Sequence, residues 1–163
     1  MSKARMAIPK SEYLERIGKI QEQMAAQGID LLVTHACECD SSNVRYLSNF
    51  WAVFDFVGVL IPQRGSAMML TGGPESYDFA VQFSQIDDIR IHPLYVETAA
   101  PEWDKPTDAF DFSKLFEEIG ATQPIKTIGI ANKNIIPHEI MKDIQKGAPN
   151  AKYVEAQKII DDV

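Results

Sequence analysis

The chain has 163 residues, of which 45% are hydrophobic and 24% charged, and its formal net charge is −7 at pH 7. This balance predicts one soluble globular domain with a sizeable core. The absence of a basic stripe argues against nucleic-acid binding, and no apolar run approaches the ~20 residues of a membrane helix. The first residues lack the apolar stretch of a secretory signal, so a cytoplasmic location is expected.

The beginning of the chain predicts a helix followed by a short buried strand. Ser11 is the expected N-cap of this helix, and Gly28 is its expected C-terminal stop. Residues 31–34 are apolar on consecutive positions, which is typical of a strand that is covered on both faces. Apolar residues recur every three or four positions along the helix and form a stripe of Leu14, Ile17, Ile20, Met24 and Ala25.

The segment 43–61 combines a polar turn, a short helical turn and a nearly uncharged apolar run. Five aromatic residues fall between Tyr46 and Phe56, with a single carboxylate among them. Burial in the core is the ordinary position of each large ring. Aromatic residues are also enriched where proteins contact ligands and partners, and a core strand over 57–61 does not need several rings at its entrance. We therefore predict an exposed contact lip that consists of Phe50, Trp51, Phe54 and Asp55.

The rest of the chain alternates helices with apolar strands. A turn at 62–65 predicts a hairpin over about 55–71, and Pro74 is expected to open a helix. The inner face of that helix is predicted to contain Tyr77, Ala80 and Val81. Later strands are expected at 89–96, 127–131 and 152–154, and later helices at 112–120, at 136–146 and from 155 onward. This order predicts an α/β fold, a three-layer α/β/α sandwich with a mixed sheet of roughly six strands.

Two cysteines in the segment His35-Ala36-Cys37-Glu38-Cys39-Asp40 raise the question of a soft-metal site. A structural zinc ion usually takes four ligands, and the chain has no second pair of cysteines. We therefore interpret Cys37 and Cys39 as free thiols in a loop, and we expect no metal site in this chain.

Other short motifs are incomplete, so no catalytic residue is predicted in this chain. His138-Glu139 begins the His-Glu-x-x-His pattern of a zinc helix, but Lys142 stands where the second histidine is needed. The pair Gly72-Gly73 precedes a helix without the spacing of a phosphate-binding loop, and a turn is favoured. The irregular loop 99–109, which contains Trp103, is a second candidate for contact with a partner.

The order of several motifs resembles the N-terminal domain of the creatinase / Xaa-Pro peptidase family, which includes prolidase and aminopeptidase P. Asn43 and Tyr46 are structural positions of the family motif. Asn49 stands where the family usually has glycine, and asparagine also tolerates positive φ. The segments that carry the resemblance are Gly28-Ile29-Asp30-Leu31-Leu32-Val33-Thr34, Asn43-Val44-Arg45-Tyr46-Leu47-Ser48-Asn49-Phe50, Lys126-Thr127-Ile128-Gly129-Ile130 and Ala156-Gln157-Lys158-Ile159-Ile160.

The resemblance implies a sandwich of ribonuclease-H-like type over 1–156, followed at 157–163 by the start of a linker helix to a C-terminal catalytic domain. It implies that this chain is the non-catalytic part of a metal-dependent Xaa-Pro dipeptidase or aminopeptidase. Two divalent metal ions, such as manganese, would be held by the catalytic domain. The chain alone is therefore expected to lack peptidase activity.

The resemblance also implies a homodimer in which the lip shapes the substrate pocket of the partner subunit. Phe50, Trp51 and Phe54 would exclude water from a peptide or small-molecule substrate, and Asp55 would attract a free amine. Two alternatives remain within the same fold, the N-terminal domain of a creatinase-type amidinohydrolase and a binding module without hydrolysis. A free-standing α/β protein with an unrelated ligand site is a further alternative.

Overall fold

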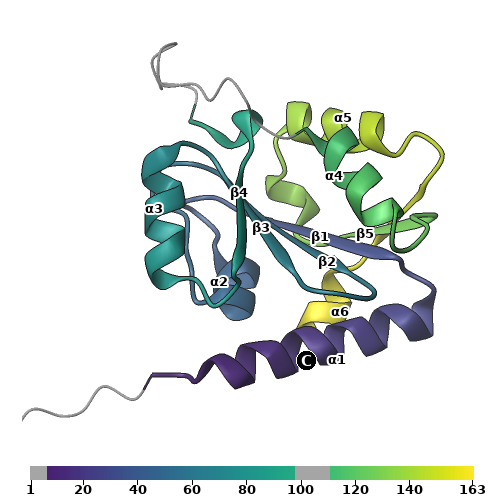
Figure 1. Cartoon of the computed structure of the whole chain (residues 1–163), viewed down its shortest axis with the longest axis horizontal. Coiled ribbons are helices and arrows are strands. Elements are labelled where there is room, and N and C mark those ends of the chain that lie inside the picture. The colour runs from purple at the N-terminus through teal and green to yellow at the C-terminus, as the bar shows by residue number, and fades with distance from the viewer. Residues whose placement is uncertain (1–6, 98–110) are drawn as a thin grey trace, which may run out of the picture.

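A mixed sheet of six strands runs through the computed structural model, which describes residues 7–97 and 111–163 (Figure 1). The strand order is β4-β3-β2-β1-β5-β6. Strands β1, β2 and β3 pair antiparallel, whereas β4, β5 and β6 each pair parallel to a neighbour. The mixed sheet predicted from the sequence is therefore confirmed. The strands are β1 Leu31–Ala36, β2 Val57–Pro62, β3 Met68–Thr71, β4 Asp88–Ile91, β5 Thr127–Ile130 and β6 Lys152–Glu155.

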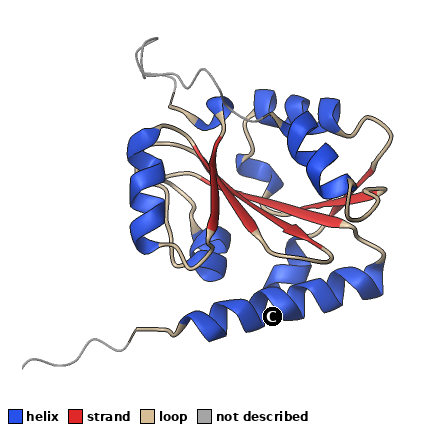
Figure 2. Cartoon of the chain, viewed as in Figure 1, coloured by secondary structure: helices blue, strands red, loops and turns tan. Residues whose placement is uncertain are grey.

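Helices cover both faces of this sheet, which gives the three layers that the sequence predicts (Figure 2). One core cluster joins the sheet to α1, α2, α3 and α6, and a second cluster joins the opposite face to α4, α5 and η1. The helices are α1 Lys10–Gln27, α2 Ser42–Ser48, α3 Pro74–Phe83, α4 Phe112–Gly120, α5 His138–Gly147 and α6 Gln157–Asp161, with 3₁₀ turns η1 Pro93–Tyr95 and η3 Lys133–Ile135.

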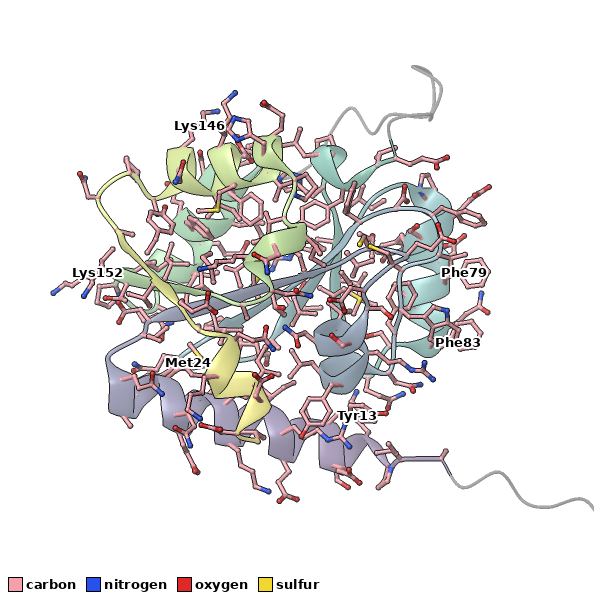
Figure 3. All side chains as sticks on the ribbon, turned by 180° about the vertical axis from the view of Figure 1, so that it is seen from behind. Tyr13, Met24, Phe79, Phe83, Lys146 and Lys152 are labelled. Atoms are coloured by element: carbon pink, nitrogen blue, oxygen red, sulfur yellow. The ribbon has the colours of Figure 1, made fainter. Side chains whose placement is uncertain are left out.

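Helix α1 differs from its sequence prediction in its start and in its buried face. It begins at Lys10, and its N-cap position is Pro9 rather than Ser11. Leu14 and Ala25 are exposed, whereas Tyr13 packs inward because its ring continues the buried line of the helix. Gly28 ends the helix as predicted, at a φ of 65° that glycine adopts readily. The buried residues are Tyr13, Ile17, Ile20 and Met24, of which the first and last are labelled in Figure 3.

Strand β1 is buried along all six residues and lies between β2 and β5. It extends two residues beyond the predicted 31–34, because His35 and Ala36 continue the pairing with β2. Asp30, just before the strand, accepts hydrogen bonds at 2.8 Å from the N–H groups of Lys126 and Thr127. One side chain therefore fixes the start of β5 beside the start of β1.

Two further elements differ from their predictions. In α3 the buried residues are Ser76 and Ala80, whereas Val81 is exposed. The strand predicted over 89–96 ends at Ile91, because Pro93 has no N–H to continue the ladder and instead opens the turn η1. The predicted hairpin is confirmed as β2 and β3, while the loop 99–109 lies outside the described residues.

Candidate functional site

The carboxylate of Asp55 is buried and caps the start of helix α3. Only 7% of the residue is exposed. One carboxylate oxygen accepts hydrogen bonds from the N–H of Gly73 at 2.9 Å and from the hydroxyl of Ser76 at 2.6 Å. The other accepts the N–H of Glu97 at 2.8 Å, and the positive end of the helix also stabilises the charge. The structure therefore gives Asp55 protein partners, where the sequence predicted a group turned toward a substrate amine.

The pair Gly72-Gly73 makes room for this carboxylate. A Cβ atom on Gly72 would overlap the Cγ atom of Asp55. Because the carboxylate already occupies the N-terminus of α3, no phosphate group fits at the same backbone position. Gly72 and Gly73 form a bend, and the N–H of Gly73 already binds Asp55.

The predicted contact lip is divided by the structure into buried and exposed residues. Phe50 is only 4% exposed and packs in the core, so the core alternative is correct for this ring. Trp51 is 43% exposed and Phe54 is 63% exposed, and Val53 between them is also exposed. The two exposed rings therefore belong to the segment 51–54, called the ring loop below, in which Ala52 is buried.

Two phenylalanines of α3 extend the apolar surface of the ring loop. Phe83 lies 6.4 Å from Trp51 and Phe79 lies 6.0 Å from Phe83, measured between ring centroids. The guanidinium carbon of Arg45 lies 5.2 Å from the centre of the Trp51 ring, a cation–π contact. Figure 3 shows Phe79 and Phe83 pointing outward from α3. These two rings were not predicted as contact residues, although their spacing of four residues places them on one helix face.

A surface hollow of about 690 Å³ adjoins the ring loop. Its lining combines Phe54 and Phe56 with an acidic turn and one aliphatic side chain. It therefore presents both apolar and polar groups to solvent. The remaining lining residues are Cys37, Glu38, Cys39, Asp55 and Ile135.

The structure brings two of the three histidines together around Tyr95. The Nε2 atom of His35 lies 2.6 Å from the hydroxyl oxygen of Tyr95, and the ring of His92 meets the Tyr95 ring edge-on. Burial lowers the pKa of His35 to about 3 and raises the pKa of Tyr95 well above its ordinary value. Burial also lowers the pKa of His92, although Asp143, 3.3 Å away, opposes that shift.

This histidine–tyrosine cluster is therefore uncharged at neutral pH and closed to solvent. The Nδ1 atom of His35 is buried without a hydrogen-bond partner in the described residues, whereas the Nε2 atom of His92 lies 3.3 Å from the carboxylate of Asp143. Protonation of His35 therefore destabilises the fold, because no partner compensates its buried charge. The histidines lie in different elements of the sequence, and the packing of η1 against β1 brings two of them together.

Replacing Gly58 by alanine is expected to lower the free energy of unfolding by about 2 kcal/mol. A Cβ atom there would lie 2.6 Å from the Tyr95 hydroxyl oxygen, and the buried ring has no space to move into. Chemical denaturation measures the effect. Gly18→Ala is the matched control, because its Cβ meets nothing within 4 Å in the middle of α1 and is expected to stabilise the chain slightly. Equal effects of the two changes would contradict the close packing at Gly58.

The two family-motif residues make structural contacts. The side-chain amide of Asn43 donates to the hydroxyl of Thr34 at 2.9 Å and to the amide oxygen of Gln157 at 2.8 Å. Gln157 donates back to Asn43 at 3.1 Å, so the pair joins α2 to the first residue of α6. Tyr46 packs under Arg16, whose guanidinium carbon lies 4.3 Å from the ring centre.

The residues that the structure describes contain no group of three or more histidine, cysteine or acidic side chains arranged to hold a metal ion. Cys37 and Cys39 are free, and His35 points into the buried cluster with Tyr95 instead of joining them. His138 lies exposed at the start of α5. None of the described helices has both the length and the apolar character required to span a membrane.

Several peptidases share this fold over nearly the whole chain. The prolidase of Pyrococcus horikoshii superposes with a TM-score of 0.61 and 20% identity, covering 91% of this chain and 34% of its own. The dipeptidase PepE of Mycobacterium ulcerans gives a TM-score of 0.65 and 12% identity, covering 97% and 38%. The N-terminal domain of the cytoplasmic peptidase PepQ from Mycobacterium tuberculosis superposes with a TM-score of 0.56 and 18% identity. This match covers 91% of this chain and 97% of the PepQ domain.

Sequence comparison leads to the same group. An uncharacterized hydrolase/peptidase, y4tM of Sinorhizobium fredii, is 23% identical over 154 residues, which are 93% of this chain and 37% of that protein. The chain therefore spans about a third of the length of this relative and of the P. horikoshii prolidase. The model of the creatinase/prolidase N-terminal domain matches residues 16–163. As the motif order suggested, the chain belongs to the creatinase/prolidase N-terminal domain family.

Proposed function

We propose that this chain is the non-catalytic N-terminal domain of a metal-dependent Xaa-Pro dipeptidase or aminopeptidase, which it pairs into dimers. Membership of the family and the peptidases that share the fold support this proposal. The divalent metal ions would be held by a C-terminal catalytic domain, since the described residues offer no group for them. In this proposal the domain covers 1–156, and 157–163 begins the linker helix.

The observation that carries the proposal is the exposure of Trp51 and Phe54 beside a buried anchor. Large rings are exposed here although Phe50, immediately before them, is buried. Exposed aromatic groups that are held rigidly are effective contact residues, because little conformational entropy is lost when they bind. We propose that the ring loop completes the substrate pocket of the partner subunit and excludes water from it.

The hydrogen bonds of Asp55 explain how the ring loop is held. Asp55 follows Phe54 directly, and its carboxylate is bonded to the start of α3 and to the backbone at Glu97. Phe50 at the other end is buried in the core. Both ends of the ring loop are therefore fixed, and its exposed rings are presented in a defined position.

In the full-length protein, Trp51→Ala and Phe54→Ala are each expected to lower kcat/KM for an Xaa-Pro dipeptide by about 10- to 100-fold. This corresponds to a rise of about 1.4 to 2.7 kcal/mol in the activation free energy. Their effect on the free energy of unfolding is expected to be about 1 kcal/mol or less, because roughly half of each ring already faces solvent. Steady-state kinetics with manganese and chemical denaturation measure the two quantities.

Leu14→Ala is the matched control, since it removes an exposed apolar side chain from α1, which contributes no residue to the ring loop. It is expected to leave kcat/KM unchanged. Light scattering on the same proteins tests the dimer. If activity falls only in proportion to stability, the rings serve the fold alone. If the active enzyme is a monomer, no pocket is completed across subunits.

A further inference from the structure

Two cysteine side chains lie side by side in an exposed turn. The Sγ atoms of Cys37 and Cys39 are 3.0 Å apart, which is closer than non-bonded sulfur atoms normally approach. Both thiols are free, Cys39 is exposed and Cys37 is half-buried. They line the hollow beside Phe54, so small solutes can reach them. The pair thus combines proximity of the two sulfur atoms with access for a small disulfide that can oxidise them.

The backbone of the turn holds the two sulfur atoms in this position. The N–H of Cys37 donates to the carbonyl of Asp40 at 3.0 Å, and the N–H of Asp40 donates back to the carbonyl of Cys37 at 3.1 Å. The carboxylate of Asp40 accepts hydrogen bonds from Ser42 and, at 3.2 Å, from the side chain of Asn132. The loop between the cysteines is therefore anchored on both sides, and the thiols approach each other without a rearrangement of the fold.

A metal ion fits this arrangement less well than a bond between the sulfur atoms. Zinc holds each sulfur at about 2.3 Å in tetrahedral geometry, which requires a wider separation than the observed 3.0 Å. The described residues also supply no third metal-binding side chain beside the pair. A disulfide needs only a further approach of two atoms that are already neighbours.

We propose that Cys37 and Cys39 form a redox-active dithiol, which closes reversibly to a disulfide by exchange with a low-molecular-weight disulfide such as glutathione disulfide. One thiolate attacks a sulfur atom of glutathione disulfide and releases one glutathione. The second thiolate attacks the protein sulfur of the mixed disulfide and releases the second glutathione. The protein loses two protons and two electrons, and glutathione disulfide takes up both electrons.

The position of the bond makes it reversible. A disulfide that closes so short a loop is strained, and strained or exposed disulfides are the labile ones. The hydrogen bond and the charge of Cys37 raise the pKa of Cys39 above its ordinary value. Exchange is therefore expected to become faster as the pH rises and more thiolate forms. This chemistry is independent of the peptidase function proposed above.

The test is a redox titration of the chain, whose only cysteines are these two. Reduced protein is equilibrated in a series of buffers that differ in the ratio of glutathione to glutathione disulfide. Each sample is quenched with an alkylating reagent, and the mass of the protein is measured by mass spectrometry. The expected product is a monomer that has lost two hydrogen atoms and resists alkylation, and dithiothreitol restores both thiols. Cys37→Ser and Cys39→Ser, each checked for native circular dichroism, are the comparison variants.

Because the second step is intramolecular in the wild type, its mixed disulfide is expected to be at least about tenfold less abundant than in either variant. Stable glutathione adducts in the wild type at the level seen in the variants would overturn the proposal. Disulfide-linked dimers as the main oxidised product, or two thiols that remain alkylatable in the most oxidising buffer, would also overturn it.

Discussion

Replacing Asp55 by alanine is expected to lower the free energy of unfolding by about 3 kcal/mol. The change removes a buried carboxylate that accepts hydrogen bonds from Gly73, Ser76 and Glu97. It leaves polar groups at the start of α3 without partners and also removes the negative charge that the helix terminus favours. Chemical denaturation with circular dichroism measures the loss.

Asp55→Asn is expected to destabilise the chain by nearly as much, although its shape is conserved. All three partners of Asp55 donate hydrogen bonds to its carboxylate. An amide would turn its own NH₂ group, also a donor, toward at least one of these donors. Asp87→Asn is the matched control, because Asp87 is exposed and its ion pair with Lys10 lies on the surface, so an effect within about 0.5 kcal/mol is expected. A stable Asp55→Asn protein with lost substrate binding would instead favour the sequence-based role of Asp55 toward a substrate amine.

Acidification from pH 7 to pH 5 is expected to lower the free energy of unfolding by about 2 kcal/mol through His35 alone. Further acidification to pH 4 is expected to lower it by about 1 kcal/mol more. The pKa of His35 is lowered from 6.5 in the unfolded chain to about 3 in the fold, by burial first and by the nearby His92 second. Below pH 6.5 the unfolded chain therefore binds more protons, and stability falls as the pH falls. Above pH 7 both states are neutral at this residue, and the effect disappears.

The groups around His35 determine how this effect is isolated. Tyr95 contacts His35 directly. Burial lowers the pKa of His92 as well, although the charge of Asp143 opposes this shift. Protonation of His92 therefore adds to the loss of stability at low pH. His35→Gln is expected to remove about 2 kcal/mol of the difference between pH 7 and pH 5. The exposed His138→Gln should retain the wild-type pH dependence. A wild-type protein that is equally stable at both values would show that the cluster opens to water.

The layers of the fold were predictable because they follow from patterns that are local in the chain. Alternation of helical and apolar segments is enough to predict the sandwich, and Gly28 marks the end of the first helix correctly. The errors occurred where side chains compete for one buried face. Leu14 and Val81 are apolar but exposed, whereas Tyr13 and Ser76 are buried, because tertiary contacts and not hydrophobicity alone decide which side of a helix packs inward.

The candidate site was only partly predictable from the sequence. The concentration of rings around Trp51 pointed to a loop with two exposed rings, but no pattern along the chain shows that Phe50 turns into the core while Phe54 turns out. The partners of Asp55 lie 18 to 42 residues away, so its capping role depends on the folded arrangement. For the same reason the meeting of His35 with Tyr95, 60 residues apart, could not be predicted.

The position of β1 in the sheet also has a consequence for the order in which the chain assembles. Its antiparallel partner β2, Val57–Pro62, is the next strand along the chain, whereas its parallel partner β5 comes much later, and Asp30 reaches across 97 residues to Thr127. Closing so long a loop costs more entropy than forming the nearby hairpin, which slows that step. We therefore expect β1, β2 and β3 to form the early folding nucleus, onto which β5 and β6 are added last.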